Sequence, residues 1–351
     1  MQKVIKTIIA AGAAAMMLTA CSSGAPAATS AAPSSAASTS AAAPSIKVGM
    51  AYDVGGRGDQ SFNDSAAAGL DKAAKEFGVE IKESAATNGE AASAREERLN
   101  QLIEAGYTNI VAVGFAYADS VKKVAAANPD VKFAIVDDSS ITADNVMNLT
   151  FSANQGSFLV GAAAALTSKS KHVGFVGGVE TDLIKAFEAG FVAGVKAVDP
   201  NIKIDSKYLT QPPDFSGFGD VAKGKAAAEG MYQSGADVVY HAAGGSGGGV
   251  FTAAKAAGAW AIGVDSDQAL TAPEDVRSVI LTSMIKRVDV GVYTFIKSVH
   301  DNAFKGGTTL FDLEADGVGY STTGGNVDAI KDKLEAFKAD IIAGKITVPE
   351  K

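Results

Sequence analysis

The sequence predicts an α/β protein with two doubly wound, parallel-sheet lobes joined by a multi-strand hinge. Three observations support this fold class. Apolar, β-branched runs alternate with segments that have helical spacing of apolar residues, and this alternation occurs twice in tandem. The chain has 351 residues, of which 47% are hydrophobic and 20% charged, enough for two domains with buried cores. Because strands that alternate with crossover helices pair in parallel, each series should form a parallel sheet.

The first series of predicted elements extends from residue 46 to residue 136. Its first strand, 46–53, runs into the glycine pair Gly55-Gly56, and a helix over 62–77 follows, with Gly78 placed to end it. Further strands are expected at 79–82, 109–113 and 132–136, with helices at 91–105 and 120–127.

The second series begins after Phe151. Helices are expected at 156–166, 181–198, 220–233 and 250–257, with strands at 172–176, 203–209, 236–241 and 259–264. A strand-like run at 279–285 and a helix at 287–304 are too short for a third domain, so they should return to complete the first unit. The predicted lobes are 46–151 plus about 285–316, and 152–284 plus about 317–351.

Residues 1–20 have the form of a secretory signal. Lys3 and Lys6 precede an apolar run that is shorter than the roughly 20 residues of a membrane-spanning helix. The tetrad Leu18-Thr19-Ala20-Cys21 resembles the bacterial lipoprotein box, in which the cysteine is lipidated and becomes the mature N-terminus. The alternative is an ordinary signal peptide with a chance cysteine.

Residues 21–45 are predicted to be a disordered tether behind the lipidated Cys21. From Ser22 to Ser45 every residue is Ala, Ser, Thr, Pro or Gly, so the segment cannot bury enough surface to offset its lost chain entropy. As a flexible coil it spans about 25–30 Å. Such a tether would hold the lobes clear of a membrane surface.

Composition excludes several function classes. A formal net charge of −8 gives no reason to expect nucleic acid as a partner. A single cysteine excludes a disulfide framework and a cysteine-based zinc site, and three scattered histidines offer little to a metal centre. No metal or cofactor is therefore expected, and without a Walker A loop the chain should not hydrolyse ATP.

The loop after the first strand, from Asp53 to Asn63, is the first candidate binding element, because ligands of parallel sheets bind at the carboxyl ends of strands. Its glycines permit close backbone approach. It lacks both phosphate-loop patterns, and Asp53 and Asp59 would repel an anion, so an uncharged ligand is indicated. Alternatively, Phe62 packs on its own helix and Ser61 caps it.

Other strand ends carry similar residues. One strand ends in Asp137-Asp138, another runs into the glycine-rich stretch 244–249, and a third ends at Asp265. Ionised aspartates accept hydrogen bonds, which suits the hydroxyls of a sugar or the N–H edge of a base. Taken singly, each aspartate is better explained as a helix N-cap, but three aspartates at equivalent strand ends favour a binding site.

Aromatic and basic residues complete the candidate site. Phe62 and either Phe215 or Phe218, one ring from each lobe, are placed to sandwich a planar ligand; two stacking faces contribute roughly 2–6 kcal/mol. Lys286 follows a strand and can donate to a ribose or base oxygen. The alternative for Lys286 is a solvated lysine at a helix start.

Several motifs in order resemble the basic membrane protein family, from about residue 46 to the C-terminus. They are Asp53-x-Gly-Gly-x-x-Asp59-x-Ser-Phe62-Asn63, Gly174-Phe-Val-Gly-Gly178, Phe187-Glu-Ala-Gly-Phe191, Gly219-Asp-Val-Ala-Lys-Gly224, His241-Ala-Ala-Gly-Gly245, Gly263-Val-Asp-Ser-Asp-Gln268 and Thr282-Ser-Met-Ile-Lys-Arg-Val-Asp289. The resemblance implies a type I periplasmic-binding-protein fold. It also implies a substrate-binding lipoprotein of an ABC importer, similar to purine nucleoside receptors, on the extracytoplasmic face of the cell membrane, with a permease and its ATPase as partners.

The resemblance assigns roles to individual residues. In the family pattern Asp53, Phe62 and Asn63 belong to the first lobe's pocket, and Asp137 faces the base. Asp265 and the glycine turn near Gly245 take the ribose, and Lys286 closes the site. The family's second stacking ring stands before an Asp-Pro pair; here Val221 replaces that proline, which leaves open whether Phe218 or Phe215 stacks.

The resulting hypothesis is a binding protein, not an enzyme, that captures nucleosides, with purines expected, and presents them to the permease. Two rivals remain: a nucleoside hydrolase that uses the aspartates with calcium, and a sensor component or surface adhesin on the same fold.

Overall fold

Twelve strands in two six-stranded sheets form the framework of residues 46–351, the part of the chain that the computed structural model describes. The first sheet has the order β11-β5-β4-β3-β1-β2 and the second the order β12-β10-β9-β8-β6-β7. The strands of the first sheet are β1 (Lys47–Tyr52), β2 (Glu80–Ala85), β3 (Asn109–Ala112), β4 (Lys132–Val136), β5 (Val146–Phe151) and β11 (Gly307–Phe311). The second contains β6 (His172–Val179), β7 (Lys203–Thr210), β8 (Val238–Ala242), β9 (Trp260–Asp265), β10 (Ile280–Lys286) and β12 (Val318–Tyr320).

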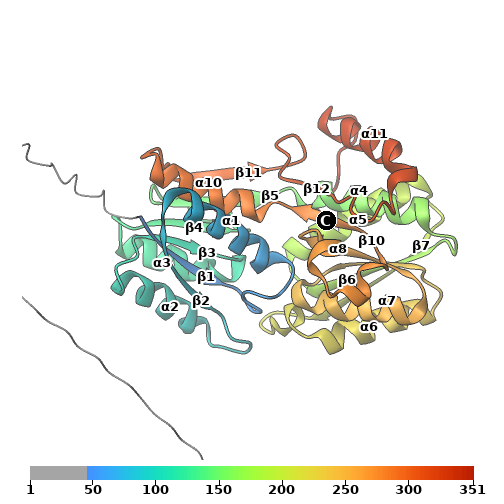
Figure 1. Cartoon of the computed structure of the whole chain (residues 1–351), viewed down its shortest axis with the longest axis horizontal. Helices are drawn as coiled ribbons and strands as arrows, with labels where there is room; N and C mark the ends of the chain where they lie inside the picture. The colour runs from blue at the N-terminus through green and yellow to red at the C-terminus, as the bar shows by residue number, and fades with distance from the viewer. Residues whose placement is uncertain (1–45) are drawn as a thin grey trace, which may run out of the picture. The chain divides into compact units, whose positions relative to one another are not determined.

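Every strand pair in the described sheets is parallel except β10 with β12. We call each sheet with its packed helices a lobe; Figure 1 shows lobe 1 at the left and lobe 2 at the right. The prediction of two parallel α/β lobes is confirmed. The signal peptide, Cys21 and the tether predicted for 1–45 lie outside the described residues.

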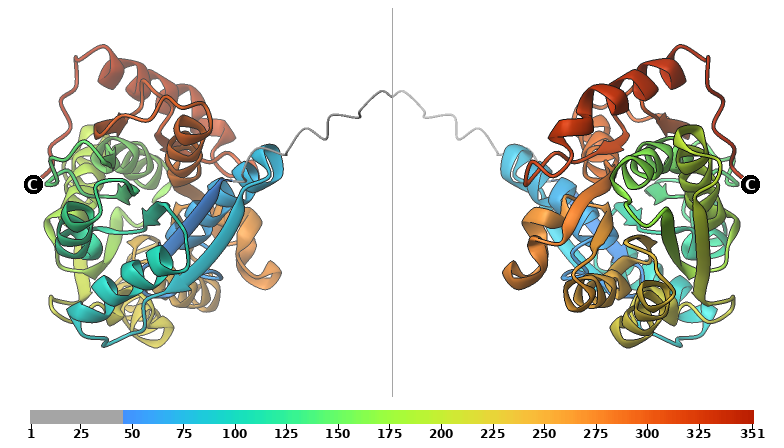
Figure 2. Two further views of the ribbon diagram at one scale, coloured as in Figure 1. Left: turned by 90° about the vertical axis from the view of Figure 1, so that its left-hand side faces the viewer. Right: turned by 90° about the vertical axis from the view of Figure 1, so that its right-hand side faces the viewer.

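Helices cover both faces of each sheet, so the inner strands are buried on both sides and read as continuous apolar runs. Lobe 1 carries α1 (Phe62–Phe77), α2 (Ala92–Glu104), α3 (Ala118–Ala127) and α10 (Val288–His300). Lobe 2 carries α4 (Ala153–Thr167), α5 (Asp182–Val198), α6 (Val221–Gln233), α7 (Gly247–Ala257), α8 (Gln268–Thr271), α9 (Glu274–Arg277) and α11 (Lys331–Ile342). Figure 2 shows α11 (red) on the opposite side of lobe 2 from α6 and α7 (yellow).

Helix α1 illustrates why the local sequence gives these elements. Leu70 and Ala73 lie on its buried face against the first sheet. Gly78 ends the helix at φ 66°, a left-handed conformation that glycine adopts without a Cβ clash. The helix predicted over 62–77 is thereby confirmed to its last residue.

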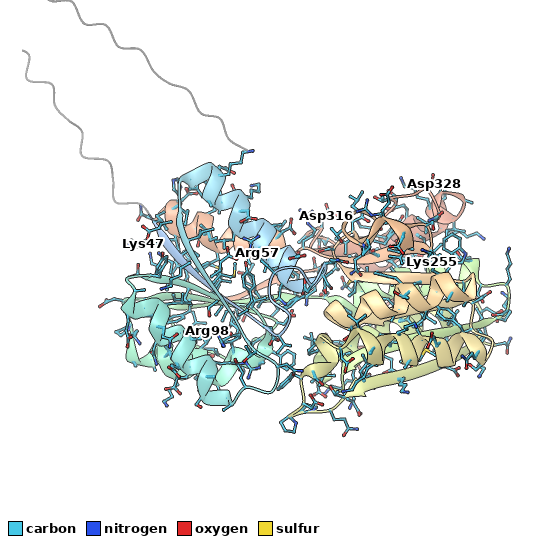
Figure 3. The ribbon with its side chains drawn as sticks, turned by 60° about the horizontal axis from the view of Figure 1, so that its bottom comes forward. Lys47, Arg57, Arg98, Lys255, Asp316 and Asp328 are labelled. Carbon is cyan, nitrogen blue, oxygen red and sulfur yellow. The ribbon has the colours of Figure 1, made fainter. Side chains whose placement is uncertain are left out.

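The chain passes between the lobes three times, at residues 151–153, 286–288 and 311–318. The crossings are hydrogen-bonded to one another: Ser152 N–H donates to the Phe311 carbonyl and Arg287 N–H to that of Gly317, at 3.0 and 2.9 Å. Asp316, labelled in Figure 3, lies in the third crossing. These segments form the predicted multi-strand hinge.

One expectation about the chain path is wrong. The strand predicted at 279–285 does not complete lobe 1; as β10 it pairs in parallel with β9 and lies between β9 and β12 in the second sheet. An inner position suits it because its residues from Ile280 to Met284 are buried. The following helix, α10, does return and packs against α1 of lobe 1. The exact residue boundaries of the lobes stay a prediction.

Candidate functional site

A cavity lies between the lobes, at the carboxyl ends of strands from both sheets. Lobe 1 contributes Asp53, Val54, Asp59, Phe62, Asn63, Gly114, Phe115 and Asp137. Lobe 2 contributes Leu183, Ile184, Phe187, Phe218, Ala242, Gly244, Val264, Asp265 and Lys286. We call this space the interlobe cavity.

The loop between β1 and α1 is held by Asp59. Its Oδ1 accepts the N–H groups of Ser61 and Asp64, and its Oδ2 accepts the backbone and side-chain N–H groups of Asn63, at 2.8 to 3.1 Å. These bonds satisfy the free N–H groups at the start of α1. Asp59 therefore shapes the loop that places Phe62 and Asn63 at the cavity wall.

Two aspartates occupy equivalent positions, one in each lobe. Asp137 directly follows β4 and Asp265 ends β9, and both have left-handed backbones, at φ 66° and 65°. Aspartate tolerates this conformation better than most residues. Both side chains line the cavity, which agrees with the prediction that carboxylates converge there.

Lys286 and Asp137 form an ion pair across the lobes. Lys286 Nζ lies 2.5 Å from Asp137 Oδ2, and the two side chains are only 2% and 4% exposed. The rings of Phe62, Phe151 and Phe187 surround the ammonium group, with centroids 4.9 to 5.5 Å away. The ammonium charge is thus balanced by one carboxylate and stabilised further by three aromatic rings.

Burial dominates the protonation of the remaining carboxylates. It raises the pKa of Asp53 to about 6, although Val54 N–H donates to Asp53 Oδ1 at 2.8 Å and the Arg95 guanidinium lies 3.8 Å from that oxygen. Burial also raises the pKa of Asp265 to about 6, against the opposing attraction of Lys286. Asp265 Oδ2 accepts the hydroxyl of Ser61 at 2.6 Å. Ser61 therefore does not use its side chain to cap α1, as the alternative interpretation required.

Aromatic side chains from both lobes form the walls. Phe62 comes from α1, while Phe187 and Phe218 come from lobe 2. A Cβ at Gly178 would lie 2.5 Å from the Phe218 ring, so glycine is required there. Phe215 does not line the cavity; its ring meets Phe115 edge-on at 6.0 Å, and the Arg95 guanidinium lies over its face.

The structure brings together seven of the eight predicted ligand-binding residues. Asp53, Phe62, Asn63, Asp137, Phe218, Asp265 and Lys286 line the cavity. Gly245 does not, whereas its neighbour Gly244 does. Of the two candidate rings, Phe218 is the one in the cavity wall.

Sequence reasoning missed several wall residues, above all Phe187 and Leu183 of α5 and Phe115 after β3. Phe187 belongs to the Phe187–Phe191 motif, but no binding role was predicted for it, because a phenylalanine on a helix is usually part of the hydrophobic core. The one signal that separates Phe187 from a core phenylalanine is its place in the first turns of α5, directly after the carboxyl end of β6. Within residues 46–351, no three histidine, cysteine or acidic side chains are grouped to hold a metal ion, and no helix has the length and apolarity to cross a membrane.

Comparisons with known proteins agree with this geometry. Residues 46–351 match the sequence model of the Bmp family, described as ABC transporter substrate-binding protein PnrA-like. A CD4+ T-cell-stimulating antigen of Listeria monocytogenes is 41% identical over 320 residues, covering 87% of this chain and 88% of that protein. An ABC transporter nucleoside-binding protein, BmpA, of Lactococcus lactis is 37% identical over 322 residues, covering 87% and 90%.

A solved ABC transporter solute-binding protein from Aeropyrum pernix superposes with a TM-score of 0.75 at 30% identity, covering 87% of this chain and 94% of that one. The myo-inositol binding protein of Caulobacter shares the fold at a TM-score of 0.60 and 15% identity, with 81% and 95% covered. The type I periplasmic-binding-protein fold expected from the motifs is confirmed.

Proposed function

The chain belongs to the Bmp family of PnrA-like ABC transporter substrate-binding proteins, and we propose that it captures a nucleoside between its two lobes and delivers it to a membrane permease. The observation that carries this proposal is the interlobe cavity, in which each lobe supplies both an aromatic face and a carboxylate. The lactococcal relative named as nucleoside-binding supports the same ligand class.

The chemistry of the cavity fits an uncharged aromatic glycoside. A base between Phe62 and the rings of lobe 2 gains about 1–3 kcal/mol for each stacked face. Asp53 and Asp265 accept hydrogen bonds from hydroxyl or base N–H groups, and Asn63, whose amide N–H groups donate to Asp59 and to the Val54 carbonyl, accepts through Oδ1. The carboxylates oppose a phosphate, so nucleosides are favoured over nucleotides; a purine fills more of the space than a pyrimidine.

The N-terminal sequence supports the proposed location. Lipidation of Cys21 would anchor the protein at the extracytoplasmic face of the membrane, near a permease and its ATPase. The ligand is bound and released without chemical change: Lys286 is paired with Asp137, and Asp53 and Asp265 accept hydrogen bonds from the ligand. Inosine incubated with the protein, with or without Ca²⁺, should therefore release no base.

Calorimetry tests the proposal directly. We expect inosine, guanosine and adenosine to bind more tightly than uridine or cytidine, with hypoxanthine, ribose and inosine monophosphate at least tenfold weaker than inosine. Asp265→Ala should weaken inosine binding at least tenfold, which is about 1.4 kcal/mol. Phe62→Ala should lose about 1–3 kcal/mol of binding free energy if its ring stacks on the base. Equal affinity for ribose and inosine, or none for any nucleoside, would exclude the proposal.

A further inference from the structure

A second set of contacts joins the lobes beside the cavity, between the loop after β1 and the loop after β9. Gln268 Nε2 donates to the carbonyl of Gln60 at 3.0 Å, and the Ser266 hydroxyl donates to the carbonyl of Ser61 at 2.9 Å. The Ser61 hydroxyl donates in return to Asp265 Oδ2. We call these five residues the latch: Gln60, Ser61, Asp265, Ser266 and Gln268.

Hydrogen bonds within lobe 2 fix Gln268 in the position from which it contacts lobe 1. Its Oε1 accepts Val264 N–H at 2.8 Å, its own N–H donates to the Ser283 hydroxyl at 3.1 Å, and the residue is 1% exposed. These bonds fix the side-chain amide, so its N–H group meets the Gln60 carbonyl with little loss of conformational freedom. A fixed donor in one lobe thus faces a backbone acceptor in the other.

Neither Gln268 nor Ser266 lines the interlobe cavity, but both contact residues adjacent in sequence to ones that do. Gln60 and Ser61 immediately precede Phe62 and Asn63, and Ser61 is bonded to Asp265. The latch therefore ties the position of the aromatic and amide groups of lobe 1 to the carboxylate of lobe 2.

We propose that Gln268 and Ser266 are positioning residues for ligand capture, which hold the β1–α1 loop in its closed place without touching the ligand. Only one part of the test, the measurement of inosine binding, depends on the proposed nucleoside-binding function. Breaking the latch shifts the lobes toward an open arrangement. The observed affinity for the ligand then falls, because part of the binding free energy is used to close the lobes. The loss appears mainly in the dissociation rate.

Gln268→Glu, measured at a pH high enough to ionise the buried carboxyl, keeps an oxygen for Val264 N–H and removes the Nε2 donor to Gln60, whose carbonyl keeps the Thr271 hydroxyl at 3.3 Å. Gln233→Glu, the same change on the exposed face of α6 in the same lobe, is its matched control. Ser266→Ala removes the second donor, and Ser266→Thr restores a hydroxyl. Inosine is the probe, measured in the full chain carrying Cys21→Ser.

The ligand-independent readout is the distance between spin labels at Ala126→Cys of α3 and Ala226→Cys of α6, both exposed, one in each lobe. We expect Gln268→Glu and Ser266→Ala to broaden and lengthen this distance and to raise the inosine dissociation rate about tenfold. Ser266→Thr and Gln233→Glu should behave as the parent. Unchanged distances in both latch variants, or a loss that Ser266→Thr does not restore, would overturn the proposal.

The two proposals fail separately. If the parent binds no nucleoside while the label distance still lengthens in Gln268→Glu, the latch stands and the nucleoside assignment falls. If the parent binds inosine and neither distance nor dissociation rate responds to Gln268→Glu and Ser266→Ala, the latch falls and the nucleoside assignment stands.

Discussion

Asp265 shows how a residue of the cavity wall is held in place at a cost to folding. Its carboxylate is buried, its backbone is left-handed, and one of its oxygens already accepts the Ser61 hydroxyl. Lys286 favours the ionised form, whereas Asp137 and Asp59 disfavour it together with burial. A group held under such conflict is typical of a functional position.

This conflict gives the first prediction, for Asp265→Asn. Because the pKa rises from 3.8 to about 6, the folded state binds the proton more tightly than the unfolded state, and the free energy of unfolding falls as pH rises from about 4 through 6. Asparagine keeps the shape, accepts from Ser61 and tolerates φ 65°. We expect the variant to be more stable by up to about 3 kcal/mol at pH 8. The advantage should vanish near pH 4.

Urea denaturation of parent and variant at pH 4, 6 and 8 measures this difference. An advantage that is the same at pH 4 and pH 8 would show that burial of the charge is not its cause. The variant should also bind inosine more weakly, so that stability and affinity change in opposite directions.

The second prediction concerns the Lys286–Asp137 pair. Lys286→Met removes the cation and leaves a buried carboxylate unpaired, which costs about 3–5 kcal/mol. Adding Asp137→Asn removes the unpaired charge with a side chain suited to φ 66°, and should recover at least about 1 kcal/mol. Chemical denaturation of both variants measures this; a double variant no more stable than the single one contradicts the argument.

The sequence predicted the polar residues of the site better than the apolar ones. Strand-end aspartates and Lys286 stood out because charged residues are rarely buried without a reason. Phe187 did not, since its burial in a cavity wall and in a core give the same pattern. The difference between Phe215 and Phe218 depends on how the loop after β7 folds, with Phe215 drawn to Phe115 and Arg95 of the other lobe.

At the scale of elements, helices α4 and α5 pack with their backbones unusually close. A Cβ at Gly190 would overlap the Asn154 carbonyl, one at Gly194 the Phe158 carbonyl, and one at Gly161 the Phe191 carbonyl. Three glycines therefore set the separation of the two helices. That separation positions the start of α5, where Leu183 and Phe187 enter the cavity wall.

The third prediction compares two glycines. Gly194→Ala should destabilise the protein by about 1–3 kcal/mol or more, because rigid backbone opposes the new methyl group. Gly230→Ala, in α6 with open space around it, should stabilise by about 0.5–1 kcal/mol through helix propensity alone. Thermal melts of the two variants give the measurement, and similar melting temperatures would refute the close-packing account.

Alternating strands and helices were predictable because each inner strand is a short apolar run and each helix has a clear buried face. The strands β5, β11 and β12 and the helices α8, α9 and α11 were missed. Strand β11 is mostly exposed and β12 has three residues, so their strand conformation depends on pairing with β5 and β10. Such edge pairings are set by tertiary contacts and leave little local signal.

At the scale of the whole molecule, one of the three hydrophobic clusters of residues 46–351 extends through both lobes, while the other two lie within one lobe each. A single cluster of buried side chains includes Leu70 of α1 and Phe295 of α10 in lobe 1, together with Phe158 of α4 and Phe191 of α5 in lobe 2. The C-terminal segment also supplies a strand to each sheet, β11 to the first and β12 to the second. Neither lobe can be completed from one continuous stretch of chain.

This shared core predicts that both lobes unfold in one cooperative transition despite their separate sheets. Trp260, the single tryptophan of the chain, lies in β9, so its fluorescence reports lobe 2, while far-ultraviolet circular dichroism reports both lobes. The two urea midpoints should coincide. Inosine at a hundredfold excess over its Kd should raise the stability measured by either probe by about 2.7 kcal/mol, because the ligand binds only the form in which both lobes are folded. Separate midpoints, or a ligand effect on one probe alone, would mean that lobe 1 and lobe 2 fold independently and that the hinge transmits no stability between them.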